Sequence, residues 1–143
     1  MTVAAILAAK GRDVATIAPE QSISDAIHDL AARRIGALVV VEDRDRIVGI
    51  LSERDIVRAI ARDGVEILDE PVATIMTRSV VTCVDGDAIN QVMSVMTRGR
   101  FRHLPVVESG RLSGIVSIGD VVKERIEEVE REAEHLRVYI ATA

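Results

Sequence analysis

Apolar and polar residues follow two alternating periods in the first half of the chain. Residues 14–17 form a short apolar run, which predicts a β-strand. Apolar side chains then recur at the spacing of one helix face, at Ile23, Ala26, Ile27, Leu30 and Ala31. We expect this helix to end near Gly36, because glycine readily takes the backbone conformations that terminate a helix.

Two further apolar runs follow this helix and predict a β-hairpin. They span residues 37–41 and 46–51, and a polar turn at residues 42–45 separates them. The spacing of Ile56, Val57 and Ile60 then predicts a second helix. The first half of the chain is therefore expected to form a β-α-β-β-α unit.

The same unit occurs a second time, and this duplication is the strongest structural feature of the sequence. Three pairs of segments match: 14–17 with 80–83 and 38–42 with 104–108 at an offset of 66 positions, and 49–57 with 114–122 after one residue is lost from the hairpin turn. The predicted strand at 14–17 therefore has a predicted counterpart at 80–83.

The duplication sets the expected domain organisation. We predict repeat 1 at residues 1–64, repeat 2 at residues 70–127 and a helical extension at residues 128–143. Each repeat begins with a similar apolar leader, at residues 3–7 and 72–76. Neither repeat could bury both faces of its sheet alone, so we expect the two to pack about a pseudo-twofold axis. The predicted fold class is α/β (α+β), with a linker between the repeats and an extended C-terminal helix.

The C-terminal helix carries an apolar stripe that the repeat itself does not need. Its members are spaced 4, 3, 4, 3 and 4 residues apart, at Val122, Ile126, Val129, Ala133, Leu136 and Ile140. Such spacing is typical of a heptad seam. The stripe either packs on its own repeat or forms a seam with the same helix of a second subunit.

A serine and an aspartate three residues apart follow the returning strand of each hairpin. The pairs are Ser52 with Asp55 and Ser117 with Asp120. This spacing fits a capping box, in which the serine and the acid satisfy free backbone NH groups at a helix start. The same place also offers an anion free NH groups and the positive end of the helix dipole. Because the pair recurs at the same strand exit, we favour a ligand-binding role over capping alone.

A nucleotide monophosphate fits this arrangement. The carboxylate can accept hydrogen bonds from the two vicinal hydroxyls of a ribose, while the serine and the helix amides face a phosphate. Arg54, beside the first pair, adds a positive charge.

Composition excludes several classes of partner. The 143 residues carry a net charge of −5 and two aromatic side chains, whereas nucleic-acid-binding proteins usually show a basic face or stacking aromatics. We therefore expect no nucleic-acid partner. No apolar run approaches the length of a membrane span, and the first residues do not resemble a secretory signal peptide. We therefore expect no membrane partner and a cytoplasmic location.

The remaining reactive side chains do not form a catalytic or metal-binding motif. His28, His103 and His135 are scattered, and a single cysteine, Cys83, is expected to be a small core residue. For His103, a structural role and a phosphate contact are both open. The Lys10-Gly11-Arg12 segment is expected to be a solvated turn, with phosphate contact as the alternative. We therefore predict no metal, no catalytic cofactor and no enzymatic activity.

The repeated unit with its Gly-x-x-Ser-x-x-Asp motif resembles the cystathionine-β-synthase (CBS) domain, and the tandem resembles a CBS pair, or Bateman module. The resemblance covers roughly residues 3–126, and the segment 102–106 is similar to the stretch that precedes the family's motif. It implies two clefts between the repeats that bind AMP, ADP, ATP or NAD.

The resemblance also implies which residues form each cleft. One site would combine Ser52, Arg54 and Asp55 with Thr82, Phe101, Arg102 and His103. The other would combine Ser117 and Asp120 with Thr16, Ile35, Gly36 and Ala37. We expect the Asp55 site to be better equipped for phosphate, because Arg102 and His103 stand where the other repeat has Gly36 and Ala37.

The expected function is that of a regulatory module. It would bind an adenine nucleotide between its repeats and signal by a change of shape or of partner, with an unidentified protein as the regulated partner. The resemblance implies a flat homodimer, to which the C-terminal helices can add a seam. The alternative is a structural dimerisation or adaptor module whose clefts bind nothing.

Overall fold

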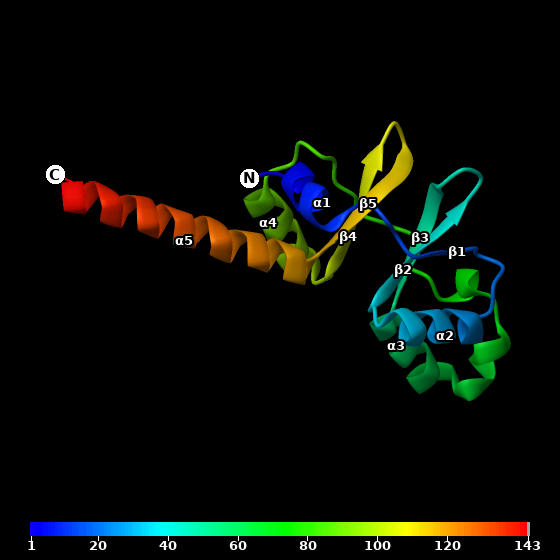
Figure 1. The fold of residues 1–143 in the computed structure, drawn as a ribbon. Helices are drawn as coiled ribbons and strands as arrows, with labels where there is room; N and C mark the ends of the chain where they lie inside the picture. Colours follow the sequence, from blue (N-terminus) through cyan, green and yellow to red (C-terminus); the bar gives the residue numbers. More distant parts are fainter. Residues whose placement is uncertain (143) are drawn as a thin grey trace.

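Two β-hairpins with the same register lie at the centre of the two halves of the chain. In the first, β2 (Ala37–Glu42) pairs with antiparallel β3 (Arg46–Ser52), and in the second, β4 (His103–Glu108) pairs with antiparallel β5 (Arg111–Ser117) (Figure 1). Each hairpin has a register shift at the same point, after Val40 and after Val106. The computed structural model describes residues 1–142 and confirms the predicted mixed α and β fold with two similar halves.

The other elements surround these hairpins. They are α1 (Val3–Lys10), β1 (Thr16–Ile17), α2 (Ile23–Arg33), α3 (Glu53–Asp63), the 3-10 helices η1 (Val65–Asp69) and η2 (Val72–Thr74), α4 (Ile89–Gly99) and α5 (Ile118–Thr142). The first half has the predicted β-α-β-β-α order, in which β1 adds a parallel strand to β2.

The strand predicted at residues 80–83 is wrong. In its place, Cys83 alone makes a parallel bridge with Val106, through hydrogen bonds to the backbone of Pro105 and Val107. The chain turns at Asp85 and Gly86 immediately afterwards, so the strand has no room to continue. The thiol of Cys83 is buried as expected, and burial raises its pKa to about 12.

Helix α2 begins as its sequence predicts but ends earlier than expected. Ser22 caps it by accepting a hydrogen bond from the backbone NH of Asp25, at 3.0 Å. The helix stops at Arg34, whose φ of 54° is left-handed, and not at Gly36. Arg100 ends α4 in the same way, with φ of 57°. A left-handed residue other than glycine costs about 1–2 kcal/mol, so both positions hold some strain.

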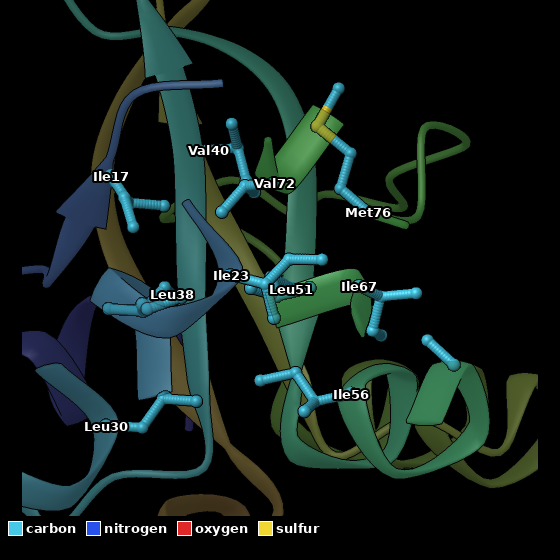
Figure 2. Close-up of a cluster of buried hydrophobic side chains, with 12 residues drawn as sticks. Ile17, Ile23, Leu30, Leu38, Val40, Leu51, Ile56, Ile67, Val72 and Met76 are labelled. Atoms are coloured by element: carbon cyan, nitrogen blue, oxygen red, sulfur yellow. The ribbon is translucent and has the colours of Figure 1, made fainter. Parts of the chain in front are cut away.

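The first hydrophobic core lies between the β1–β3 sheet and helices α2 and α3 (Figure 2). Its buried residues are aliphatic throughout: Ile17, Ile23, Ala26, Leu30, Leu38, Val40, Leu51, Ile56, Ala59, Ile67, Val72 and Met76. Ile67 belongs to η1, so the segment expected to be a linker contributes a 3-10 helix and a core side chain. Gly64 ends α3.

The leaders of the two repeats pack across the boundary between them. Val72 and Met76, from the second leader, are buried in the first core. Leu7 and its neighbours on α1, from the first leader, are buried in the second core with residues of α4, β4 and β5. Figure 1 shows α1 beside α4 accordingly. The division into residues 1–64 and 70–127 stays a prediction, but the packing joins each half to the start of the other.

The first glycine of each motif, Gly49 or Gly114, is closely approached by the leader of the other repeat or by the residue that follows it. A Cβ added at Gly49 would lie 2.6 Å from the sulfur of Met76 and 3.1 Å from the backbone oxygen of Thr77. At Gly114, an added Cβ would lie 3.0 Å from Leu7. The motif therefore needs glycine at this position because another segment crosses the strand there.

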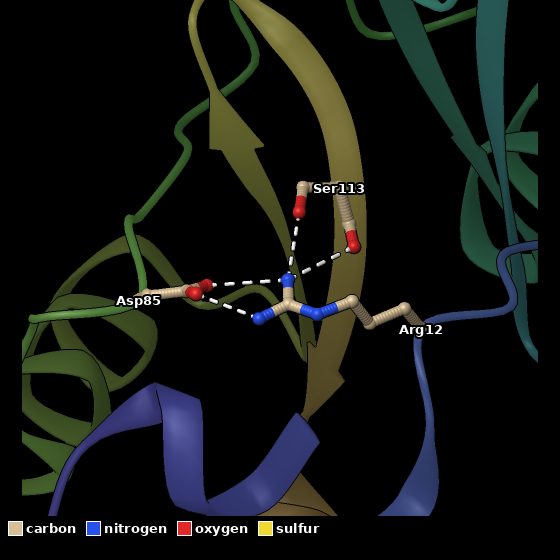
Figure 3. A network of polar contacts seen from close by, with 3 residues as sticks. All are labelled: Arg12, Asp85 and Ser113. Carbon is tan, nitrogen blue, oxygen red and sulfur yellow. Dashed lines mark hydrogen bonds and ion pairs between the residues drawn. The ribbon is translucent and has the colours of Figure 1, made fainter. Parts of the chain in front are cut away.

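Arg12 fixes the segment that connects the two halves. Its guanidinium donates hydrogen bonds to both carboxylate oxygens of Asp85 and to the hydroxyl of Ser113, the last at 2.7 Å (Figure 3). The hydrogen bond to Asp85 raises the pKa of Arg12. The segment 10–12, which was expected to be a solvated turn, is therefore held by hydrogen bonds from Arg12 to Asp85 and Ser113.

Helix α5 extends away from the rest of the molecule (Figure 1). Its first turn is anchored by Val121, which is fully buried in the second core. The five larger residues of the predicted apolar stripe beyond it stay exposed, with exposed fractions from 42% at Val122 to 67% at Ile140, and Ala133 is half-buried. Of the two alternatives for this stripe, packing on its own repeat is therefore excluded.

Candidate functional site

A cavity of about 730 Å³, here called the first cleft, lies between the two halves. One side is formed by the end of β3 and the start of α3, and the other by residues 77–81 and the turn between α4 and β4. Its size lies within the range of small-molecule sites in proteins. Residues far apart in the sequence therefore form one concave surface.

Asp55 lies in the first cleft as part of a complete capping box. Its Oδ2 accepts hydrogen bonds from the backbone NH of Ser52 at 2.9 Å and from the Ser52 hydroxyl at 3.1 Å. The NH of Asp55 donates to Ser52 in return. The other oxygen, Oδ1, accepts a longer bond of 3.3 Å from the hydroxyl of Thr77. Capping thus occupies one carboxylate oxygen and leaves the second with capacity for a ligand hydroxyl.

Arginines give the first cleft its positive charge. Arg54, Arg58, Arg100 and Arg102 line it, against the two acids Glu53 and Asp55. Arg54 spans the cleft by donating to the backbone oxygen of Arg100 at 3.2 Å. The start of α3 is therefore linked to the end of α4, and the surplus of cations suits an anionic group.

The apolar part of the first cleft comes from both halves. It is lined by Ile50, Val57, Val80, Val81, Phe101 and Pro105. A flat apolar group such as a purine base can bury its faces against such a surface.

A second cleft of about 480 Å³ lies on the other side of a shared wall. Gly36, Ala37 and His103 line both cavities. Burial lowers the pKa of His103, and the charges of Lys10 and Arg102 lower it further, against the opposing effects of Asp120 and Glu53. The imidazole between the clefts is therefore neutral at neutral pH.

The second cleft has its own cations. Lys10, Arg33 and Arg34 line it, with one acid, Asp13. The expectation that the first cleft, with Asp55, has more groups suited to phosphate stays a prediction. The second cleft is also lined by cations, which the motif alignment did not indicate.

Asp120 forms the same local cap as Asp55 but is engaged further. Its Oδ2 accepts from the NH of Ser117 at 2.9 Å and from Nζ of Lys10 at 2.7 Å. Burial alone would raise the pKa of Asp120, but the hydrogen bonds from Lys10 and Ser117 outweigh it and hold the pKa below its usual value. Lys10 lines the second cleft, whereas Asp120, to which it is paired, does not.

Most of the residues expected at the two sites are brought together. Ser52, Arg54, Asp55, Phe101, Arg102 and His103 line the first cleft, and Ser117, Ile35, Gly36 and Ala37 line the second. Thr82, Thr16 and Asp120 lie outside these linings. The residues just before each threonine line the clefts instead. Val80 and Val81 precede Thr82 and line the first cleft, and Val14 and Ala15 precede Thr16 and line the second. The side chains of Thr82 and Thr16 are exposed elsewhere.

The two left-handed arginines were missed by motif reasoning. Arg100 lines the first cleft and Arg34 the second, each at the end of a helix. Strained backbone positions are often found at ligand sites. The signal was present in the sequence, because these two arginines are related by the same offset of 66 positions as the strands.

Metal-binding clusters and membrane-spanning helices are both absent from residues 1–142, the part of the chain that the structure describes. In this described part of the chain, no three His, Cys, Asp or Glu residues are grouped so as to hold a metal ion. No helix there is both long enough and apolar enough to span a bilayer.

The model of the CBS domain matches the chain twice, over residues 8–62 and 72–127. The chain belongs to the CBS domain family. The two matches together cover most of the sequence and confirm the resemblance on which the expected sites were based.

Solved structures of CBS proteins share this fold. A CBS-domain-containing protein of Agrobacterium tumefaciens is 48% identical, with a TM-score of 0.85 over 87% of this chain and 99% of that one. A CBS domain protein of Pyrobaculum aerophilum, complexed with AMP, is 30% identical, with a TM-score of 0.74 over 84% and 89% of the two chains. A third CBS domain pair, in complex with 5-methylthioadenosine and S-adenosyl-L-methionine, is 26% identical, with a TM-score of 0.79 over 90% and 98%.

Curated relatives include longer proteins. The chain is 34% identical over 125 residues to the mitochondrial CBS domain-containing protein CBSX3 of Arabidopsis thaliana, which corresponds to 85% of this chain and 61% of that protein. It spans 66% of a relative from Acidianus ambivalens.

Proposed function

We propose that the chain is a regulatory module that binds an adenosine ligand in its first cleft. The observation that carries the proposal is the position of Asp55, whose Oδ1 faces a cleft lined by arginines on one side and apolar residues on the other. The complexes of two CBS relatives, one with AMP and one with two adenosine derivatives, support this ligand class.

The chemistry of the lining suggests how such a ligand would be held. The Asp55 carboxylate would accept hydrogen bonds from the ribose hydroxyls, replacing the long bond from Thr77. The base would lie against Val80, Val81 and Pro105 of the second half. Phosphate would meet Arg54, Arg100 and Arg102, for which a bidentate guanidinium contact is well suited.

The second cleft is proposed as a second, unequal site. Arg33 and Arg34 supply positive charge there. Asp120, however, lies outside the lining of this cleft, and its Oδ2 is already paired with Lys10. We therefore propose that the first cleft fills at lower ligand concentrations than the second.

Ligand binding would act on the arrangement of the two halves. The first cleft is lined from both of them, so a ligand there bridges them, and it shifts their packing to the extent that it binds one arrangement more tightly. The ligands within this proposal are AMP, ADP, ATP and NAD, and the response would pass to a homodimer partner or to a regulated protein in the cytoplasm. No catalytic step is part of the proposal.

A thermal-shift screen with AMP, ADP, ATP, NAD and S-adenosylmethionine tests it. A ligand at about 100 times its Kd stabilises the folded state by about 2.7 kcal/mol, which raises the melting temperature of a chain of this size by roughly 5–10 °C. We expect such a rise with at least one adenosine compound and none with the matching uridine compound.

An adaptor with unused clefts is the competing function. It is favoured by the capping boxes, because Asp55 and Asp120 already have a structural role without ligand. No shift with any compound in the screen would favour this alternative. Product release from ATP on incubation would instead show that the chain is a nucleotide-hydrolysing enzyme.

A further inference from the structure

The exposed stripe of α5 has the geometry of a coiled-coil seam. Six residues at alternating spacings of 4 and 3 place Ile126, Ala133 and Ile140 at the a positions of a heptad and Val122, Val129 and Leu136 at the d positions. The stripe is about 27 Å long at 1.5 Å per residue. β-branched residues at a with leucine at d favour two-stranded coils. Two of the three a positions are isoleucine, and one of the three d positions is leucine while the other two are valine.

The body of the molecule leaves this face of the helix free. Val121, which anchors α5 in the second core, is fully buried, whereas the next residue, Val122, is 42% exposed. Successive helical residues point about 100° apart, so the stripe faces to the side of the body and not into it. Because α5 extends outward, a second helix can lie along the stripe without displacing the core (Figure 1).

The charges that flank the stripe identify the occupant and its direction. The g positions hold Arg125 and Glu132, and the e positions that follow them by five residues hold Glu130 and Arg137. In a parallel coil, each g residue faces the e residue of the next heptad on its partner. A second copy in register therefore places Arg125 opposite Glu130 and Glu132 opposite Arg137, and symmetry repeats both attractive pairs.

An antiparallel pair of the same helices that covered the whole stripe would be repulsive. There, e positions face e positions, so Glu130 would lie opposite its own copy and Lys123 opposite Arg137. The ion pairs that Arg125 and Arg137 make within one helix, to Glu128 and Glu134, are partly exposed and well exposed, respectively, and can be exchanged for pairs between helices.

We propose that α5 pairs in parallel and in register with α5 of a second copy of this chain. The a and d residues from Val122 to Ile140 form the buried seam, and the pairs Arg125–Glu130 and Glu132–Arg137 set its direction. This pairing is independent of the ligand proposed for the clefts. It brings two modules together at one end of a common helical stem.

Cysteine cross-linking of the full chain tests the register. Val129→Cys and Leu136→Cys each put a thiol at a d position, and Arg131→Cys puts one on the opposite side of the helix. Cys83 is buried, so wild type treated in the same way is the background control. At about 10 µM protein, a millimolar effective concentration makes disulfide formation about 100-fold faster at both d positions than at Arg131→Cys.

The pattern of cross-linking decides the proposal. Fast disulfide formation in both d variants supports the parallel register. Fast formation in one of the two, equal rates in all three variants, or slow rates in all of them would overturn it.

A charge-swap experiment in the Leu136→Cys background tests the pairing of charges. One chain carries Glu130→Lys with Glu132→Lys, and the other carries Arg125→Glu with Arg137→Glu. Each chain alone should cross-link about 10-fold more slowly than the parent, and their mixture should recover the parent rate as heterodimers. Equal rates for the separate chains and the mixture would overturn the assignment of the pairs.

Discussion

The ammonium of Lys10 lies 2.7 Å from Oδ2 of Asp120, the aspartate of the second motif. Lys10 ends helix α1, which packs in the second core although it comes from the start of the chain. The ion pair therefore ties the crossing leader to the helix that begins at the motif. It also occupies one oxygen of the carboxylate that a ribose in the second cleft would contact.

Replacing this lysine should weaken the acid dependence of stability. The pKa of Asp120 is lowered in the folded state, so the unfolded chain binds its proton first as the pH falls. The stabilisation is complete above the ordinary value of 3.8 and is lost as the pH falls through the lower, folded value. We expect Lys10→Met to reduce the change in unfolding free energy between about pH 5 and pH 2, measured by urea denaturation, by about 1 kcal/mol.

The control for this variant is Arg62→Met. Arg62 pairs with Asp63 at 2.8 Å, but both side chains are well exposed. Its removal should leave the acid dependence unchanged. An equal effect of the two substitutions would mean that Asp120 gains nothing specific from Lys10.

Gly49 should be intolerant of a side chain. The added Cβ of Gly49→Ala would lie 2.6 Å from the Met76 sulfur and 3.1 Å from the Thr77 backbone oxygen. Because backbone has to move as well as a side chain, we expect a loss of about 1–3 kcal/mol in unfolding free energy, measured by urea denaturation. Gly86→Ala is the matched control, since an added Cβ there meets nothing within 4 Å. A loss below about 0.5 kcal/mol at Gly49 would show that the leader can shift freely.

These positions also show what could be predicted from the sequence. The capping boxes at Ser52 and Ser117 depend on residues three apart, so local spacing was sufficient to predict them. The duplication predicted the order of the helices and hairpins in both halves, but not the loss of the first strand in the second half. The crossing of the leaders was not predictable, because residues 3–7 and 72–76 are similar apolar segments that would suit either core.

The residues that line the clefts were predictable from the sequence where they belong to the repeated motif, and less predictable outside it. Asp55 and Arg102 line the first cleft as expected because they lie at a strand exit and next to a strand. Thr82 lies outside it because sequence alignment of the repeats gave no information on which side chains of the irregular segment 77–83 face inward. Arg34 and Arg100 were missed because a left-handed helix end is expected at glycine.

His103 should make the fold sensitive to mild acid. Burial is the largest cause that lowers its pKa, so the unfolded chain takes up this proton at a higher pH than the folded one. Stability should therefore fall as the pH drops through about 6.5, and level off below the folded pKa. His103→Gln should remove this part of the pH dependence, measured as the urea midpoint between about pH 8 and pH 5.

His28→Gln is the comparison for this prediction. His28 is exposed and its Nδ1 lies 2.9 Å from the backbone oxygen of Ser24 on its own helix. If His28→Gln changed the pH dependence of stability as much as His103→Gln, burial of His103 between the clefts would not be the cause of that dependence.

The central claim is that Asp55 holds a ligand in addition to capping α3. Two aspartates at the same helical position separate these roles, because Asp25 lies at the third position of α2 outside both clefts. Asp55→Ala and Asp25→Ala should each destabilise the fold by about 1 kcal/mol or less as helix-start acids.

The most direct measurement is a calorimetric titration of AMP into wild type, Asp55→Ala and Asp25→Ala. Loss of hydrogen bonds to a charged carboxylate at about 1.5–3 kcal/mol each predicts an affinity about 10- to 100-fold weaker for Asp55→Ala. Asp25→Ala should bind within about twofold of wild type. Equal affinities for all three proteins, or no detectable binding to any of them, would contradict the account.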